Sequence, residues 1–183
     1  MRRVSVVGST GAGKSTLARA IAKRLAAPYV ELDAYMHQAG WRPRPDAEFL
    51  DEVERATSGA SWVVDGNYLR FVIEGPVWQR ADTVVWLDLP RRTVMRQVIA
   101  RTVRRAVTRE VLWNGNREPL SNFISLDPDD NVILWAWVKY HEIVQRYLDA
   151  MADPRWLGLD FVRLRSHAEA RRWLESVATA PAG

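Results

Sequence analysis

The chain has 183 residues, 48% of them hydrophobic, which fits a single globular domain with a sizeable core. It has no cysteine, which excludes disulfide bonds and thiolate chemistry, and its three scattered histidines make no zinc-binding cluster. A net charge of +4 and an isoelectric point near 9.7 fit an anionic small substrate and allow weak binding of nucleic acid.

The first predicted unit is a strand, a glycine-rich loop and a helix. Residues 4–7 form a short apolar run that predicts a buried strand, and apolar residues recur at helical spacing over residues 14–25. Between them, Gly8, Gly11 and Gly13 let the backbone adopt positive φ and wrap closely around a ligand. The helix start offers unpaired N–H groups and a partial positive charge, so this loop suits a chain of phosphates.

The residues of this loop follow the order of a known phosphate-binding motif. Gly8, four residues, then Gly13, Lys14 and Ser15 match the P-loop, or Walker A, motif residue by residue. The resemblance implies that Lys14 contacts the β- and γ-phosphates of ATP and that the Ser15 hydroxyl is a ligand of Mg²⁺. An ordinary glycine-rich turn would not need a lysine and a hydroxyl there. We therefore assign the whole loop to ATP: Gly8, Ser9, Thr10, Gly11, Ala12, Gly13, Lys14, Ser15 and Thr16.

Strands and helices continue to alternate along the chain. Further strands are predicted at 29–32, 62–65, 83–87 and 161–164, and helices at 46–57, 91–109, 131–151 and 168–177. Asp46 has the position of a helix N-cap, and Pro90 ends one strand and starts the next helix. Strands separated by helices predict an α/β fold, a five-stranded parallel sheet with helices on both faces.

Ligands of such a sheet bind beyond the carboxyl ends of the strands, where three aspartates stand. We favour Asp65 as a Mg²⁺ ligand, because Gly66 lets a ligand approach the backbone. Asp88 is the rival, although its place before a proline and a helix is typical of a capping residue. Asp33 either orients or deprotonates an acceptor hydroxyl or is also a cap, and the sequence leaves both open.

Arginines line one side of the helix predicted at 91–109. Arg101, Arg105 and Arg109 are spaced by four residues and therefore share a stripe. A solvated basic face would explain such a stripe. We favour a clamp on the transferred phosphoryl group, because only Glu110 and Glu118 stand nearby to balance the charge.

Two insertions interrupt the alternation. The stretch at about 108–130 is rich in Asn, Gly, Pro and Ser, which predicts a mobile, loop-rich segment over the edge of the sheet. We interpret it as a lid that excludes water from the reaction, with a structural helical hairpin as the alternative. The other insertion, at about 33–60, is assigned to the acceptor.

Taken in order, these features resemble the P-loop nucleoside and nucleotide kinases. They are the P-loop, the aspartate after the second strand, the acceptor insertion, the Asp-Gly strand end, the arginine helix and the lid. The resemblance covers nearly the whole chain, and LDAYMHQAGW, WVVDGNY and ADTVVWLDLPRR carry a closer one to the bacterial topology modulation proteins, which are adenylate-kinase-related. It implies one domain over 1–183 with the three-layer, adenylate-kinase-like P-loop NTPase fold and a helical lid. It also implies transfer of the γ-phosphoryl group of Mg-ATP to a small acceptor, a nucleoside or nucleotide being one candidate, and it makes Lys14, Asp33, Arg101, Arg105 and Arg109 the catalytic candidates.

The acceptor region departs from the adenylate kinases, which argues against AMP as the acceptor. Asn67, Tyr68 and Arg70 stand where those kinases follow Asp-Gly with Phe-Pro-Arg, and Trp41 and Arg42 replace the usual AMP-site pattern. The candidates for acceptor binding are Asp33, Trp41, Arg42, Asn67, Tyr68, Arg70 and Arg117. By the same resemblance, Arg165, Ser166 and His167 after the fifth strand are candidates for contacts with the donor base.

We therefore expect an ATP-dependent kinase with Mg²⁺ as its cofactor. A nucleotide-switched regulator associated with nucleic acid is less favoured, because the basic residues gather near the lid and no known nucleic-acid module is present. A plain NTPase is less favoured, because it needs no acceptor insertion. Without an apolar run that spans a bilayer or a signal-peptide core, we expect a cytoplasmic protein without a membrane partner. The sequence leaves the acceptor and the oligomeric state open.

Overall fold

The computed structural model describes residues 1–118, 125, 127–128 and 131–179. Its centre is a five-stranded sheet in the order β2-β3-β1-β4-β5, and all neighbouring strands pair in parallel. The strands are β1 (Arg3–Gly8), β2 (Tyr29–Glu31), β3 (Trp62–Asp65), β4 (Thr83–Leu87) and β5 (Asp160–Leu164). This confirms the predicted α/β fold with a parallel sheet.

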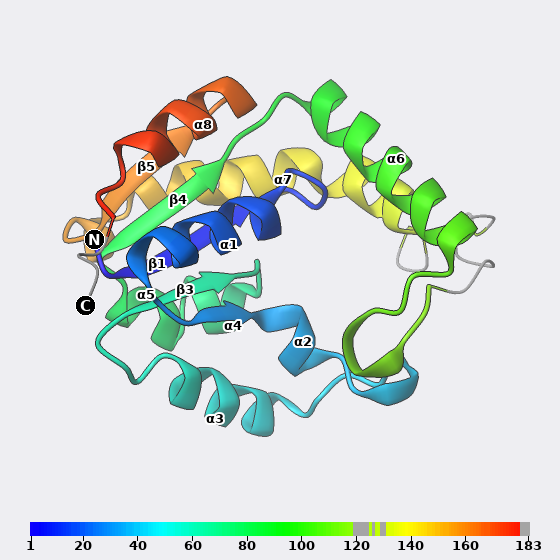
Figure 1. The fold of residues 1–183 in the computed structure, drawn as a ribbon, viewed down its shortest axis with the longest axis horizontal. Coiled ribbons are helices and arrows are strands. Elements are labelled where there is room, and N and C mark those ends of the chain that lie inside the picture. The colour runs from blue at the N-terminus through cyan, green and yellow to red at the C-terminus, as the bar shows by residue number, and fades with distance from the viewer. Residues whose placement is uncertain (119–124, 126, 129–130, 180–183) are drawn as a thin grey trace.

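Helices cover both faces of the sheet (Figure 1). The α-helices are α1 (Lys14–Leu25), α2 (Leu32–Met36), α3 (Asp46–Ala56), α4 (Leu69–Val72), α5 (Pro76–Arg80), α6 (Arg91–Thr108), α7 (Val132–Ala152) and α8 (His167–Ser176). The short 3₁₀ turns among the described residues are η1 (Ala39–Trp41), η2 (Trp113–Gly115) and η4 (Pro154–Trp156). In the described part of the chain, none of the helices combines the length and the apolar character that crossing a membrane requires.

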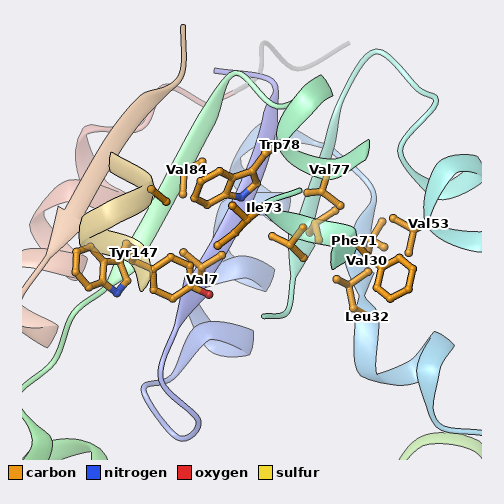
Figure 2. Packing of buried hydrophobic residues seen from close by; sticks show 14 of the residues in the cluster. Val7, Val30, Leu32, Val53, Phe71, Ile73, Val77, Trp78, Val84 and Tyr147 are labelled. Carbon is orange, nitrogen blue, oxygen red and sulfur yellow. The ribbon is translucent and has the colours of Figure 1, made fainter. Parts of the chain in front are cut away.

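The alternation of side chains along each strand divides the core into two clusters. Val7 and Val84 belong to the cluster under α3, α4, α5 and the C-terminal half of α7, which Figure 2 shows around Trp78 and Tyr147. Val6 and Val85 belong to the other cluster, against α1, α8 and the start of α6. Because both faces of the sheet are buried, its open edge at the strand ends is where a site can form.

Local structure differs from the sequence expectation near two aspartates. The chain turns into α2 immediately after Glu31, so Asp33 lies in the first turn of a helix instead of at a strand end. Asp46 is the first residue of α3, and the N-cap is Pro45, so the predicted capping role of Asp46 is wrong. Proline starts a helix readily because its missing N–H costs no hydrogen bond there.

Candidate active site

A cavity of about 1050 Å³ lies beyond the carboxyl ends of β1, β2 and β3. It brings together thirteen of the predicted site residues: Thr10, Gly11, Gly13, Lys14, Ser15, Thr16, Asp33, Trp41, Asp65, Asn67, Tyr68, Arg101 and Arg105. Residues that were not among the predicted site residues also line it, namely Arg19, Glu31, His37, Gly66, Gln97, Arg104, Glu110, Val111, Leu112, Trp113, Glu118, Val132, Trp135, Ile143 and Arg146. The acceptor candidates Arg42, Arg70 and Arg117 do not line this cavity.

The P-loop has the left-handed backbone that the glycine spacing predicted. Gly11 has a φ of 81° and Gly13 a φ of 93°. Space imposes glycine as well, because a Cβ on Gly11 would lie 2.3 Å from Cγ2 of Val98. The first turn of α1 holds no acidic residue and its N-cap is Gly13, so its free N–H groups point to an anion site.

Lys14 and Asp65 face the same cavity and influence each other's charge. The ammonium of Lys14 donates to the Ser9 carbonyl oxygen at 3.2 Å. Burial lowers the pKa of Lys14, and the carboxylates of Asp65 and Asp33 partly restore it. Burial likewise raises the pKa of Asp65, which is only 4% exposed, while the nearby Lys14 charge opposes that rise. The phosphates of a ligand would balance the charge of Lys14, and a cation bound with that ligand would balance the charge of Asp65.

The structure separates the two aspartates that competed for the metal. Asp65 lines the cavity and accepts a hydrogen bond from the Tyr29 hydroxyl at 3.1 Å. Asp88 is instead held by the Arg163 guanidinium through contacts of 2.6 and 2.9 Å. Asp65 is thus the aspartate of the two that lines the cavity, and its role as a Mg²⁺ ligand stays a prediction. The adjacent Gly66 is needed for packing too, because a Cβ there would approach Leu32 to 2.8 Å.

Asn67 fastens the start of the P-loop to β3 and to α7. Its Oδ1 accepts from the Gly8 N–H at 3.2 Å, and its Nδ2 donates to the Gly8 carbonyl oxygen at 2.6 Å. The Tyr147 hydroxyl donates to the same Oδ1 at 3.0 Å, and burial raises the pKa of Tyr147, which keeps that hydroxyl protonated. The amide of Asn67 is thus engaged by backbone and tyrosine, and its predicted acceptor contact stays a prediction.

Asp33 and Tyr68 form the centre of the acceptor end. The Tyr68 hydroxyl donates to Asp33 Oδ1 at 2.7 Å. Burial, reinforced by the neighbouring Asp33 charge, raises the pKa of Tyr68, so the tyrosine remains a donor. The bond orients a carboxylate for which the sequence left open a role toward the acceptor hydroxyl or as a helix cap.

The remaining acceptor candidates make other contacts. Arg70 pairs with Asp46, and Arg42 donates from Nε to the Ala39 carbonyl oxygen at 3.4 Å. Arg117 is exposed, and its carbonyl oxygen accepts from Trp41 Nε1 at 2.8 Å. Trp41 lines the cavity, in contrast to Arg42, Arg70 and Arg117.

The three arginines of the stripe occupy different environments. Arg105 and Glu118 form an ion pair of 2.6 Å whose side chains are 14% and 16% exposed. Arg101 lines the cavity and forms no ion pair with any described residue, and burial together with the Arg105 charge lowers its pKa. Arg109 is the exposed C-cap of α6 and lies outside the cavity lining. The carboxylate of Glu118 therefore neutralises more of the positive charge of the arginine stripe than the sequence indicated.

The tip of the predicted lid is docked on the acceptor insertion. Asn116, which is 5% exposed, accepts from the N–H groups of Gly40 and Trp41 at 2.8 and 3.1 Å and donates to the Gln38 carbonyl oxygen at 2.8 Å. Asn114 donates to the carbonyl oxygens of Ala34 and His37 at 3.1 and 2.5 Å. Figure 1 shows this segment running from the end of α6 to the region after α2. Residues 119–124, 126 and 129–130 of the predicted lid lie outside the described residues.

Three aromatic rings close the acceptor end and define what we call the aromatic wall: His37, Trp41 and Trp113. His37 and Trp113 are stacked with centroids 5.8 Å apart, and Trp41 meets each of them edge-on, at 5.3 and 6.3 Å. His37 and Trp113 line the cavity but were not predicted as site residues from the sequence. The only local signal was the turn WNGN, whose two asparagines carry the docking contacts.

The residues predicted beside the donor base form a helix cap. The Ser166 hydroxyl accepts from the Glu169 N–H at 3.1 Å, while the Arg165 N–H donates to Glu169 Oε2 at 2.7 Å. Neither residue lines the cavity. His167 lies closer to the P-loop, since a Cβ on Gly13 would be 3.8 Å from its Cε1, and its ring contacts Gln97 at 2.8 Å.

Comparison with known proteins shows the fold of this chain. No protein-family model matches it. A stretch of 52 residues is 40% identical to a cytidylate kinase of Nitratidesulfovibrio vulgaris, and the match covers 28% of this chain but only 22% of that protein. The chain thus matches about a fifth of the length of this curated relative.

Solved structures resemble the chain over almost its whole length. A shikimate kinase from Acinetobacter baumannii superimposes with a TM-score of 0.56 at 15% identity, covering 97% of this chain and 90% of the other. A deoxyadenosine kinase from M. mycoides has a TM-score of 0.51 at 12% identity, with 94% of each chain covered. The chain therefore shares the fold of these two solved structures, the adenylate-kinase-like fold that the sequence predicted.

Proposed function

We propose that the chain is an ATP-dependent phosphotransferase that moves the γ-phosphoryl group of Mg-ATP to a small-molecule acceptor. One observation carries the proposal: a single cavity is lined by the P-loop, by the carboxylates of Asp33 and Asp65, and by the guanidinium of Arg101, which has no ion pair among the described residues. A plain NTPase needs the P-loop and a magnesium ligand, but no walled space beside a further carboxylate. The structural neighbours are kinases by name, which agrees with this function.

At the donor end, the backbone N–H groups of the P-loop bind the phosphates and the helix start adds a partial positive charge. Lys14 is held near them by the Ser9 carbonyl oxygen and stabilises the charge that grows during transfer. The hydroxyl of Ser15 and the carboxylate of Asp65 are hard oxygen ligands and fit Mg²⁺. When bound, this ion neutralises charge on the phosphates.

At the acceptor end, the Asp33 carboxylate has one oxygen, Oδ1, fixed by Tyr68. Oδ2 accepts no hydrogen bond from the described residues, so it is free to bind and orient an acceptor hydroxyl and to receive its proton. Arg101 faces the space between donor and acceptor ends and stabilises charge on the phosphoryl group in transit. The docked lid tip keeps water out, which favours transfer over hydrolysis.

The test is ADP release from ATP and Mg²⁺ across a panel of nucleosides, nucleotides and other small hydroxyl or amine compounds, with ³¹P NMR of the product. We expect ADP and phosphorylated acceptor in equal amounts, and neither from the Lys14→Ala variant. ADP release that no acceptor accelerates would identify a plain NTPase. Nucleotide-dependent, sequence-selective DNA binding near physiological salt, without ADP release, would identify a regulator instead.

A further inference from the structure

We infer that the acceptor carries no phosphate group: it is an uncharged or cationic molecule that presents a hydroxyl to Asp33 and a flat or apolar face to the aromatic wall. The inference rests on the proposed function and narrows its substrate class. A phosphate monoester carries about −1.5 to −2 charges near neutral pH, so an acceptor of that kind needs cations that the donor does not already use. The charges around the cavity do not supply them.

Most of the basic side chains that line the cavity are paired with carboxylates. Six basic and five acidic residues line it. Four of the basic ones are paired within the described residues, at N···O distances of 2.6 to 3.0 Å: Arg19 with Glu31, Arg104 with Glu110, Arg105 with Glu118 and Arg146 with Glu142. Residues 119–130 and 180–183 contain no lysine or arginine, so the undescribed residues add no cation.

Lys14 and Arg101 are the two cavity cations without an ion pair in the described part of the chain, and the donor phosphates would engage both of them. Lys14 is part of the P-loop and bonds to Ser9. Arg101 is close enough to Lys14 to lower its pKa, although burial has the larger effect. A triphosphate on the P-loop would occupy both cations, which leaves none for a second phosphate.

The pair nearest to the acceptor end is also the hardest to open. Arg105 and Glu118 are both largely buried, and the Arg105 side chain lies over the Trp113 ring, 5.9 Å from its centroid. Drawing Arg105 away toward a phosphate would leave Glu118 as a buried, unpaired carboxylate, which is strongly unfavourable. The same phosphate would also be repelled by Asp33 and Glu118.

The aromatic wall supplies a different kind of contact. The His37 N–H donates to the Asp33 carbonyl oxygen at 3.0 Å, so the wall begins one helical turn after the carboxylate. Asn116 and Asn114 hold the lid side of the wall against the α2 side. Stacked and edge-on rings offer apolar surface to a flat or apolar partner, and they attract a cation more than an anion.

The test uses the full chain saturated with Mg²⁺ and a non-hydrolysable ATP analogue, so that the donor end is filled. Isothermal titration with inorganic phosphate, and with pairs of nucleosides and their 5′-monophosphates, then probes the acceptor end. We expect no phosphate binding at millimolar concentration. Wherever a nucleoside and its monophosphate both bind, the monophosphate should bind at least about tenfold more weakly.

Glu118→Gln frees Arg105, so it should create phosphate binding. It should also reduce or reverse the difference in affinity between each nucleoside and its monophosphate. Glu52→Gln, which breaks the exposed Arg55 pair on α3 outside the cavity lining, is the matched control and should change neither result.

Phosphate binding by the loaded wild-type chain, or a phosphate ester that is bound or phosphorylated better than its parent compound, would overturn the inference. In the second case transfer still occurs, so the proposed function would stand. If the ATP analogue binds but no acceptor is ever phosphorylated, the proposed function fails instead, while the phosphate titration still decides whether this end of the cavity tolerates a phosphate.

Discussion

At the scale of single residues, burial gives the charges of the site their strength. Lys14 and Arg101 are cations whose pKa is lowered by burial, and Asp65 is a carboxylate whose pKa is raised by it. Charges with so little solvent around them interact strongly with a ligand, because few water dipoles screen them. The predictions for single residues follow from this.

The Lys14→Ala variant should lose transfer activity by at least about 10²- to 10³-fold, the range found when one preorganised charge-stabilising group is removed. The fold should remain, because the loop conformation is set by glycines and backbone bonds such as Ala12 N–H to the Ser9 carbonyl oxygen at 3.0 Å. Initial rates and circular dichroism on the same preparation measure both. Turnover at the wild-type rate would remove Lys14 from the mechanism.

The Arg101→Ala variant should lower kcat by about 10²- to 10³-fold while nucleotide Kd changes much less, since the P-loop backbone supplies most ground-state binding. Lysine should rescue only partly, because it lacks the planar fork of the guanidinium. Pre-steady-state rates and nucleotide titration separate the two constants. An Arg101→Ala enzyme with unchanged kcat would show that the residue only fills space.

Arg109 provides the contrast within the same stripe. Its φ of 49° is a left-handed conformation, in which glycine is less strained than any other residue. Arg109→Gly should therefore stabilise the chain by about 0.5–1 kcal/mol and leave kcat close to wild type. Urea unfolding and steady-state kinetics test this. A large fall in kcat would restore Arg109 to the phosphate clamp that the sequence predicted.

At the scale of elements, Asn67 links three parts of the chain that are distant in sequence. Its amide binds the end of β1 and receives the Tyr147 hydroxyl from the middle of α7. α7 follows the lid, so this single side chain connects the lid-bearing helix to the phosphate loop. A displacement of α7 would therefore act on the P-loop through Asn67.

We expect Asn67→Ala to lower stability by about 1–3 kcal/mol, because it leaves the Gly8 backbone groups and the buried Tyr147 hydroxyl without their partner. It should also weaken Mg-ATP binding, whereas Tyr147→Phe should cost only about 0.5–1.5 kcal/mol of stability and affect the nucleotide little. Because Tyr147 acts through Asn67, the double variant should be less destabilised than the sum of the singles. Full additivity in unfolding experiments would refute the link.

The lid tip is the second element-scale device, and Asn116 is its centre. Removing three hydrogen bonds with Asn116→Ala should raise KM for the acceptor and increase the ratio of ADP to phosphorylated acceptor, since water enters a site whose lid no longer docks. Asn114→Gly keeps the left-handed backbone at φ 55° and removes two bonds, so it should show a milder form of the same effect. A ratio of one in both variants would mean that the docking does not control water.

At the scale of the whole molecule, the sequence was sufficient for the fold and for the backbone of the P-loop between β1 and α1. The bounds predicted for β3, β4 and α1 are those of the structure, because apolar runs and helical spacing are local signals. α2, α4 and α5 were missed because four or five residues are too few to show a period. The pairing of Arg105 with Glu118 and the bond of Asn67 to Gly8, which spans 59 residues, depend on tertiary placement and leave no pattern in the sequence.

The last prediction concerns the stability of the whole chain when the cavity is filled. Without nucleotide, the folded chain holds buried cations around an empty phosphate site, which is unfavourable. A ligand that binds only the folded state stabilises it by mass action, by about 2.7 kcal/mol at one hundred times Kd. For a domain of this size that corresponds to a rise in Tm of about 5–10 °C.

We expect this rise with Mg²⁺ and a non-hydrolysable ATP analogue, a much smaller rise in Lys14→Ala, and a further rise when a true acceptor is added. Because the lid joins the α2 side to α6 across the cavity, the acceptor increment should shrink in Asn116→Ala while the nucleotide increment stays. Differential scanning fluorimetry measures each of these increments, and a nucleotide increment that Lys14→Ala leaves unchanged would contradict binding at the P-loop.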